Sequence, residues 1–138
     1  METTNPPVPA DASRPPKSDS GENFAVAAAH LMTDLHCENV LIYDVRGLSP
    51  LTNFLVIATG TSDRQIKAMA RHISELAREQ YDLERFGSQR DDASTWLVMD
   101  FIDVMLHLFE PATRAHYDLE MMWGDAPQLQ WRHDGKPG

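Results

Sequence analysis

Two aspartates and a histidine are the residues of this chain that are best placed to do chemistry. Asp100, Asp103 and His107 lie in the stretch WLVMDFIDVMLHLFEP, residues 96–111, and carboxylates and imidazoles are the groups that bind metal ions or transfer protons in enzymes. On an extended strand, however, the four residues from Asp103 to His107 separate their Cα atoms by about 13 Å. The two aspartates could share a hard cation, but no third oxygen ligand accompanies them. The stretch therefore predicts no catalytic residue and no metal site.

The same stretch reads as two short apolar strands joined by a turn. A two-residue turn at residues 101–102 would set Asp100 opposite Asp103 and Trp96 opposite His107, all on one face. That face would carry six residues: Trp96, Val98, Asp100, Asp103, Met105 and His107. The other face would be aliphatic, and helices would cover it.

The polar side chains of this face need a reason, because like charges on facing strands weaken a hairpin. Residues that work against folding usually serve a function, and tryptophan is enriched at the centres of protein interfaces. We therefore predict that the six residues bind a partner. The alternative is structural: Trp96 would pack beneath a loop, and the aspartates would cap the turn.

The rest of the sequence offers weaker candidates. ATGTSDRQ, residues 58–65, has the outline of a phosphate-binding turn at a helix N-terminus, but it holds a single glycine and lacks the Gly-Lys-Ser that would follow. Ser62 and Gln65 instead predict a capping box. The motifs HExxH and GxSxG are absent. Cys37, the single cysteine, excludes an intramolecular disulfide and indicates a reducing compartment. No cofactor is expected.

The composition limits the class of partner. Acidic residues outnumber Lys and Arg by 21 to 12, which gives a formal net charge of −9. This balance argues against a protein that grips bare nucleic acid, since that needs clustered cations, and it permits a basic protein partner. No apolar run approaches the roughly 18 residues of a membrane span, and the first residues lack the apolar core of a signal peptide. We expect a cytoplasmic protein that binds no membrane.

The hydrophobic pattern alternates between helical and strand spacing. Apolar residues recur at helical spacing over residues 22–36 and 61–81, and continuous apolar runs of strand length cover residues 39–45 and 53–59. The two strands of the hairpin follow, and Pro111 begins a short helical segment. This order predicts an α/β (α+β) fold, in which a small mixed β-sheet has flanking helices.

The ends of the chain differ from its middle. Residues 1–21 are rich in proline and almost without aliphatic side chains, so we expect a disordered tail. Residues 22–127 would form the domain, and residues 128–138 a second, flexible tail.

Three blocks of the sequence resemble the ribosomal silencing factor family, also called Iojap. They are DVRGLSPLTNFLVIATGTSDRQIKAMA, TWLVMDFIDVMLHLFEP and HYDLEMMWGDAP, in this order and spacing. The resemblance covers about residues 22 to 127. It implies a fold similar to nucleotidyltransferases without their activity, and a translational repressor that is no enzyme. Such a factor binds the large ribosomal subunit through its L-fourteen protein and sterically blocks joining of the small subunit when nutrients are short.

The resemblance also assigns the partner-binding surface to the hairpin, and thus to the six residues of the polar face. It implies that the free chain can form a homodimer, and no sequence-specific contact with nucleic acid. The chain departs from the family pattern at Ile102, where glycine is usual, and at Gln89 and Arg90, where Glu-Gly is usual. Met105 stands where a nucleotidyltransferase would carry its second aspartate. The alternative functions are a degenerate or active nucleotidyltransferase, using Asp100, Asp103 and the turn at residues 60–62, and an adaptor for another basic protein.

Overall fold

The computed structural model describes residues 21–85, 87–90, 96–113 and 125–131. Within these ranges the chain forms two helices and five strands: α1 (Glu22–Asp34), β1 (Glu38–Asp44), β2 (Phe54–Thr59), α2 (Asp63–Tyr81), β3 (Gly87–Arg90), β4 (Trp96–Asp100) and β5 (Val104–Phe109). The expected order of helices and strands is confirmed, with β3 as an addition in a segment that the sequence presented as a polar loop. Residues 111–113 begin a helical turn, and the rest of the segment predicted to follow Pro111 lies outside the described residues up to 124.

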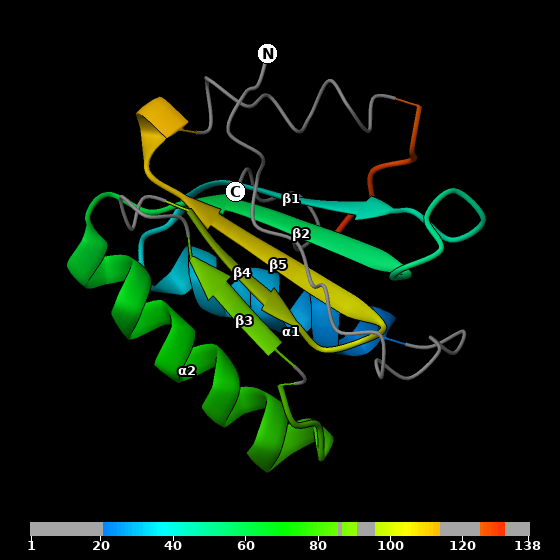
Figure 1. The fold of residues 1–138 in the computed structure, drawn as a ribbon, viewed down its shortest axis with the longest axis horizontal. Helices are drawn as coiled ribbons and strands as arrows, with labels where there is room; N and C mark the ends of the chain where they lie inside the picture. Colours follow the sequence, from blue (N-terminus) through cyan, green and yellow to red (C-terminus); the bar gives the residue numbers. More distant parts are fainter. Residues whose placement is uncertain (1–20, 86, 91–95, 114–124, 132–138) are drawn as a thin grey trace.

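The five strands form one mixed sheet in the order β1-β2-β5-β4-β3. The central pair, β2 and β5, is parallel, and the three other pairs are antiparallel. Figure 1 shows the sheet with α2 running below its β3 edge. The predicted α+β fold with a small mixed sheet is therefore confirmed.

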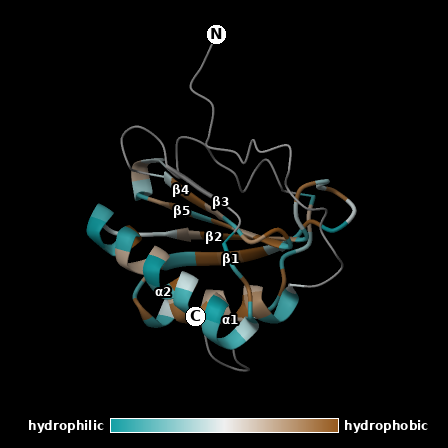
Figure 2. Ribbon diagram, turned by 60° about the horizontal axis from the view of Figure 1, so that its bottom comes forward, coloured by the Kyte–Doolittle hydropathy of each residue, from teal (hydrophilic) through white to brown (hydrophobic). Residues whose placement is uncertain are grey.

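The helices α1 and α2 lie on the same face of the sheet (Figure 2). Their apolar side chains pack with those of the strands in one large cluster, which includes Phe24, Met32, Ile66, Met69, Leu106 and Leu108. All six residues of β2 are buried, as the unbroken apolar run predicted for a strand that is covered on both faces. The sheet therefore has a second covered face, and that face carries the candidate site.

The turn before α2 is built for packing. Ser62 caps the helix by accepting a hydrogen bond from the Gln65 backbone N–H at 3.1 Å, as predicted. The Gln65 side chain in turn accepts from the backbone N–H of Thr61 at 2.6 Å. A Cβ at Gly60 would lie 2.6 Å from Cγ1 of Ile66, so the glycine is needed because α2 approaches the strand end closely. The structure thus confirms Ser62 as the helix cap, whereas the reciprocal bond of the predicted capping box is replaced by the bond from Thr61, the residue before the cap.

The hairpin register differs from the predicted one. Asp100 pairs with Met105, and Trp96 pairs with Phe109, so the register is two residues away from the prediction and the turn lies at residues 102–103. Because side chains alternate along a strand, a shift of two residues leaves the strand residues on their predicted faces. The predicted pairing of Asp100 with Asp103 is wrong, and Asp103 lies in the turn, where it lines a cavity beside Gly21 and Phe24 of the α1 side.

The folded part extends past residue 127, where the sequence predicted the domain to end. Residue Gln128 bridges to Tyr43 of β1, and the Leu129 backbone N–H donates to the Ile42 carbonyl at 2.8 Å. Trp131 is buried in the core cluster and its ring contacts His30 at 5.1 Å. Of the predicted tails, residues 1–21 and 128–138, the parts 1–20 and 132–138 lie outside the described residues.

Candidate functional site

The face of the sheet opposite the helices carries a second apolar cluster. Its members come from four strands, from the residue that follows β1 and from the segment after residue 125: Tyr43, Val45, Leu55, Ile57, Trp96, Val98, Met105, Phe109 and Ala126. Within the described residues, neither helix contributes to it. Three of the six predicted partner-binding residues, Trp96, Val98 and Met105, are members of this cluster, and all three are buried.

Trp96 and His107 form a buried polar pair at the centre of this face. The indole Nε1–H of Trp96 donates a hydrogen bond to Nδ1 of His107 at 3.0 Å. Trp96 is completely buried, and its ring lies 4.6 Å from that of Phe109. Because an indole nitrogen can only donate, Nδ1 must be unprotonated and the proton of the neutral imidazole must be on Nε2. The pair therefore defines one tautomer of His107.

Burial also sets the charge of His107. Loss of water around the ring lowers its pKa from 6.5 to about 4, because burial disfavours the charged form. The imidazole is thus neutral near pH 7. With this pKa the imidazole is a weak base. In the sheet His107 pairs with Val98, two residues away from the turn carboxylate of Asp100 along β4. His107 therefore has a structural role in the site, and it forms no acid–base pair with the aspartates of the turn.

Asp100 holds the tip of the hairpin. Its carboxylate accepts a hydrogen bond from the Ile102 backbone N–H at 2.8 Å, and the Asp103 N–H donates to the Phe101 carbonyl at 2.9 Å. Ile102 has a φ of 73°, a value that β-branched residues adopt with strain. Asp100 is buried and caps the turn through this bond. For this residue the structure agrees with the structural alternative, in which the aspartates cap the turn.

Asp103 is the one of the six predicted residues whose side chain lies partly at the surface. Its carbonyl accepts hydrogen bonds from the backbone N–H groups of Asn53 at 3.0 Å and Phe54 at 3.1 Å. These bonds attach the hairpin tip to the loop between β1 and β2. The two loops therefore form one edge of the molecule, at the end of the central strands.

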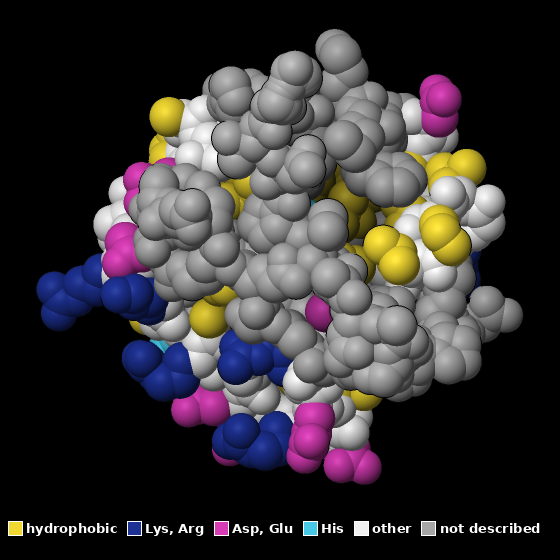
Figure 3. Space-filling model, viewed as in Figure 1, with side chains coloured by type: hydrophobic (Ala, Val, Ile, Leu, Met, Phe, Trp, Pro, Cys, Tyr) yellow, Lys and Arg dark blue, Asp and Glu magenta, His cyan; other side chains and the backbone are white. Residues whose placement is uncertain are grey.

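The β1–β2 loop carries two residues that sequence reasoning missed. Leu48 is 52% exposed and Leu51 is 40% exposed, and among the described residues these are the large hydrophobic side chains at the surface. Figure 3 shows hydrophobic side chains on this side of the molecule. The signal was the loop sequence RGLSPLT itself, where Leu48 follows Gly47 and Leu51 follows Pro50 in a segment that should be polar. Exposed apolar groups of this kind mark contact surfaces when they gather.

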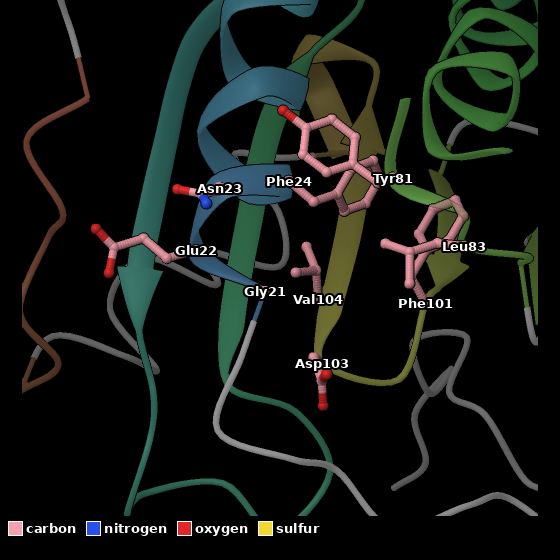
Figure 4. A pocket seen from close by; sticks show the side chains of 9 residues that line it. All are labelled: Gly21, Glu22, Asn23, Phe24, Tyr81, Leu83, Phe101, Asp103 and Val104. Carbon is pink, nitrogen blue, oxygen red and sulfur yellow. The ribbon is translucent and has the colours of Figure 1, made fainter. Parts of the chain in front are cut away.

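A cavity of about 480 Å³ opens beside the N-terminus of α1 (Figure 4). Its wall includes three aromatic rings in edge contact, with centroid distances of 5.5 Å from Phe24 to Tyr81 and 5.0 Å from Phe24 to Phe101. The charged residues in its wall are Glu22 and Asp103, and no cationic side chain of the described residues lines it. A cavity with this charge does not suit a nucleotide phosphate.

The residues that a nucleotidyltransferase would need are not gathered. The wall of the cavity contains Asp103, but it contains neither Asp100 nor the turn at residues 60–62. In the part of the chain that the structure describes, no three His, Cys, Asp or Glu side chains converge as metal ligands would. Neither of the two described helices is long and apolar enough to cross a bilayer.

Comparison with known proteins identifies the relatives of the chain. The family model described as "Ribosomal silencing factor during starvation" matches residues 18–137. Proteins named ribosomal silencing factor RsfS are 30% identical in Halalkalibacterium halodurans, over 80% of this chain and 94% of that protein, and 35% identical in Bacillus subtilis, over 72% and 84%. A mouse protein named "Mitochondrial assembly of ribosomal large subunit protein 1" is 29% identical, over 67% of this chain and 42% of its own length.

A solved structure shows the same fold. The crystal structure of a protein from Chromobacterium violaceum superposes with a TM-score of 0.64 at 28% sequence identity, and the match covers 83% of this chain and 89% of that one.

Proposed function

Because this chain belongs to the ribosomal silencing factor family, we propose that it is a translational repressor and no enzyme. It binds the large ribosomal subunit through the L-fourteen protein and blocks joining of the small subunit when nutrients are short. The family description supports silencing of ribosomes during starvation. The name of the mouse relative points to the large subunit. Acting on ribosomes, the chain would work in the cytoplasm.

The observation that carries the proposal is the edge where the β1–β2 loop meets the hairpin tip. It combines the exposed side chains of Leu48 and Leu51 with the carboxylate of Asp103, on a chain of net charge −9. Apolar anchors supply binding energy, and negative charge favours encounter with a basic ribosomal protein. Two exposed leucines on one loop and an aspartate on the adjoining hairpin tip fit such a partner.

The other five predicted residues have a different part in the proposal. Trp96, Val98, Asp100, Met105 and His107 are buried, so in the free chain they hold the strand ends and the hairpin tip in position. Direct contact between Trp96 and L-fourteen would require this face to open.

Sedimentation with purified ribosomal subunits tests the proposal. The chain should pellet with large subunits and remain in the supernatant with small ones. The double variant Leu48→Ser/Leu51→Ser should bind large subunits at least about tenfold more weakly, because two apolar anchors are lost. The control is Gln80→Ser/Gln130→Ser, which changes two exposed neutral side chains elsewhere and should bind normally.

Two results would contradict the proposal. If the wild-type chain does not pellet with large subunits, its proposed target is wrong. If it pellets and the leucine variant binds as well as the control, the large subunit remains the target, but the edge of Leu48 and Leu51 is not the contact surface.

The variant Trp96→Phe distinguishes a Trp96 that holds the edge in position from a Trp96 that contacts the ribosome directly. If Trp96 only holds the edge in position, the variant should have lower thermal stability, and its folded fraction should bind almost normally. A homodimer of the free chain, which the family resemblance suggests, would be detected by sedimentation equilibrium.

A further inference from the structure

The outer face of α2 carries a row of cationic side chains, interspersed with carboxylates such as those of Glu75 and Glu79, although the chain as a whole is acidic. Five of the chain's 12 Lys and Arg residues fall in the segment 64–85, which forms this helix and the turn after it: Arg64, Lys67, Arg71, Arg78 and Arg85. Figure 3 shows Lys and Arg side chains gathered over the region that α2 occupies in Figure 1. We call these five residues the cationic stripe.

The spacing of the stripe aligns it along the helix. Arg64, Lys67, Arg71 and Arg78 are separated by three, four and seven residues, and these intervals place side chains on one side of an α-helix. The opposite side of α2 is buried against the core. Because a helix rises 1.5 Å per residue, the stripe from Arg64 to Arg78 is about 21 Å long.

The charges of the stripe are available to a partner. Lys67 pairs with Asp63 at 3.2 Å and Arg78 with Glu79 at 3.7 Å. All four of these side chains are more than two-fifths exposed, and exposed pairs of this kind contribute little. Both can exchange their partners for a stronger anion.

The stripe also contains a hollow with hydrogen-bond donors. Arg71, Arg78 and Arg85 line a depression of about 400 Å³ together with Ala70, Ser74 and Glu75. Asp82, in the left-handed conformation with a φ of 53°, ends the helix, after which the chain supplies Arg85 to the same hollow. The hydroxyl of Ser74 is buried and has no hydrogen-bond partner in the described structure. Three guanidinium groups and an unused hydroxyl suit a phosphate group, while the Glu75 carboxylate lies beside His72, at 3.9 Å.

We propose that the cationic stripe of α2 contacts phosphate groups of ribosomal RNA when the chain is bound to the large subunit. This inference rests on the proposed function, because it adds a second contact to the one made by the edge of Leu48 and Leu51. RNA is the partner that the geometry favours, since an arginine fork binds phosphate with two parallel hydrogen bonds and a row of cations matches a row of phosphates. The contact reads no base sequence.

The acidity of the chain gives the stripe a conditional role. A net charge of −9 opposes binding to free RNA, as the composition predicted. Once the edge of Leu48 and Leu51 is bound to a basic ribosomal protein, the cationic stripe is held close to the surface of the subunit. Its contacts with RNA then form at a high effective concentration, as in an intramolecular reaction. The stripe therefore strengthens and orients a complex that the protein contact forms.

The salt dependence of binding to large subunits tests the inference. Each phosphate contact releases counterions, so the logarithm of the association constant falls with the logarithm of salt concentration by a slope of about 0.7–0.9 per contact. The triple variant Arg71→Gln/Arg78→Gln/Arg85→Gln should reduce the magnitude of this slope by about 2. It should fold normally, because the three arginines are exposed and glutamine has a similar helix propensity.

The control removes the same charge elsewhere. Arg14→Gln/Lys17→Gln/Lys136→Gln also eliminates three cations and should leave the slope near that of the wild type. If the triple variant of α2 and the control have equal slopes, the effect is one of net charge and the stripe makes no contact. Binding of the wild type to large subunits, measured in the same titration, shows separately whether the proposed function holds.

A cross-link distinguishes RNA from an acidic protein surface. Glu75→Cys places a thiol within the hollow and retains all five cations, while Cys37 is buried and escapes labelling. A short photoreactive group on this thiol should join the chain to RNA of the large subunit. Cross-links confined to ribosomal proteins would overturn the inference.

Discussion

The indole N–H of Trp96 lies 3.0 Å from Nδ1 of His107, in a cluster that contains no residue of α1 or α2 among those described. The hydrogen bond joins β4 to β5 two residues out of register, since the Cα partner of His107 is Val98 and that of Trp96 is Phe109. It fixes the tautomer of the histidine and satisfies the only polar atom of the tryptophan side chain. The same two strands end at the hairpin tip, so the pair connects the interior of the sheet to the proposed binding edge.

Trp96→Ala should lower the free energy of unfolding by about 3–5 kcal/mol, as large-to-small changes in a core do. The ring is completely buried and packs at a tilt of 35° against Phe109, and its loss also leaves Nδ1 of His107 without the donor that Trp96 supplies. Leu48→Ala, at a side chain that is 52% exposed, is the control and should change stability by less than about 0.5 kcal/mol. Urea denaturation measures both. Equal stabilities would show that the ring is not part of the core.

Stability should fall as the pH drops from about 6.5 to about 4. In the unfolded chain His107 binds a proton below its ordinary pKa of 6.5, whereas burial lowers its pKa in the folded chain to about 4. The unfolded state therefore binds more protons in this window, and acid favours it by up to about 3 kcal/mol. His107→Gln should remove this part of the pH dependence, since glutamine does not titrate.

Unfolding midpoints of the wild type and His107→Gln, measured at several pH values, separate this histidine from the carboxylates that titrate in both proteins. The stability difference between the two should change in favour of the variant as the pH falls. A difference that is independent of pH would mean that His107 is accessible to protons in the folded chain.

Ile102→Gly should be more stable than Ile102→Ala by about 1 kcal/mol. Both changes remove the same partly exposed side chain, but the φ of 73° at this position strains any residue with a Cβ, and glycine adopts it freely. Thermal unfolding of the two variants gives the comparison. If alanine were equally stable or more stable, the hairpin tip would not have the left-handed conformation in solution.

Cys37 should react slowly with iodoacetamide in the native chain at neutral pH. It is 8% exposed, and burial raises the pKa of its thiol from 9.0 to about 11, so the reactive thiolate is scarce. Alkylation should become fast in denaturant, when the thiol regains its ordinary pKa. Fast labelling of the native protein would contradict the burial of this residue beside β1.

Much of the fold follows from the sequence because burial leaves a periodic signal. The apolar runs at residues 39–45 and 53–59 predicted β1 and β2, and the Ser62–Gln65 pair predicted the start of α2. The division of the two hairpin strands between the helix-facing side and the opposite side also held, because alternation with a period of two survives a register shift of two residues; Asp103, which lies in the turn between them, is the exception.

Three features had weak signals. The strand β3 is a polar edge strand, GSQR, and its sequence shows no apolar alternation. The turn at Ile102 uses a β-branched residue at positive φ, which no turn propensity favours. The exposure of Leu48 and Leu51 depends on how the loop is folded, which tertiary hydrogen bonds to Asp103 determine. The composition shows only that the chain is acidic. It does not show that five of the 12 Lys and Arg side chains lie on α2 and the turn after it.

Formation of complete ribosomes from purified subunits tests the central claim most directly. At fixed concentrations of the two subunits, light scattering reports their joining as the chain is added. The account predicts that joining falls in proportion to the large subunits that carry the chain, and that Leu48→Ser/Leu51→Ser requires about tenfold more protein for the same effect. If ribosomes form normally when every large subunit carries the chain, this protein does not silence ribosomes by blocking subunit joining.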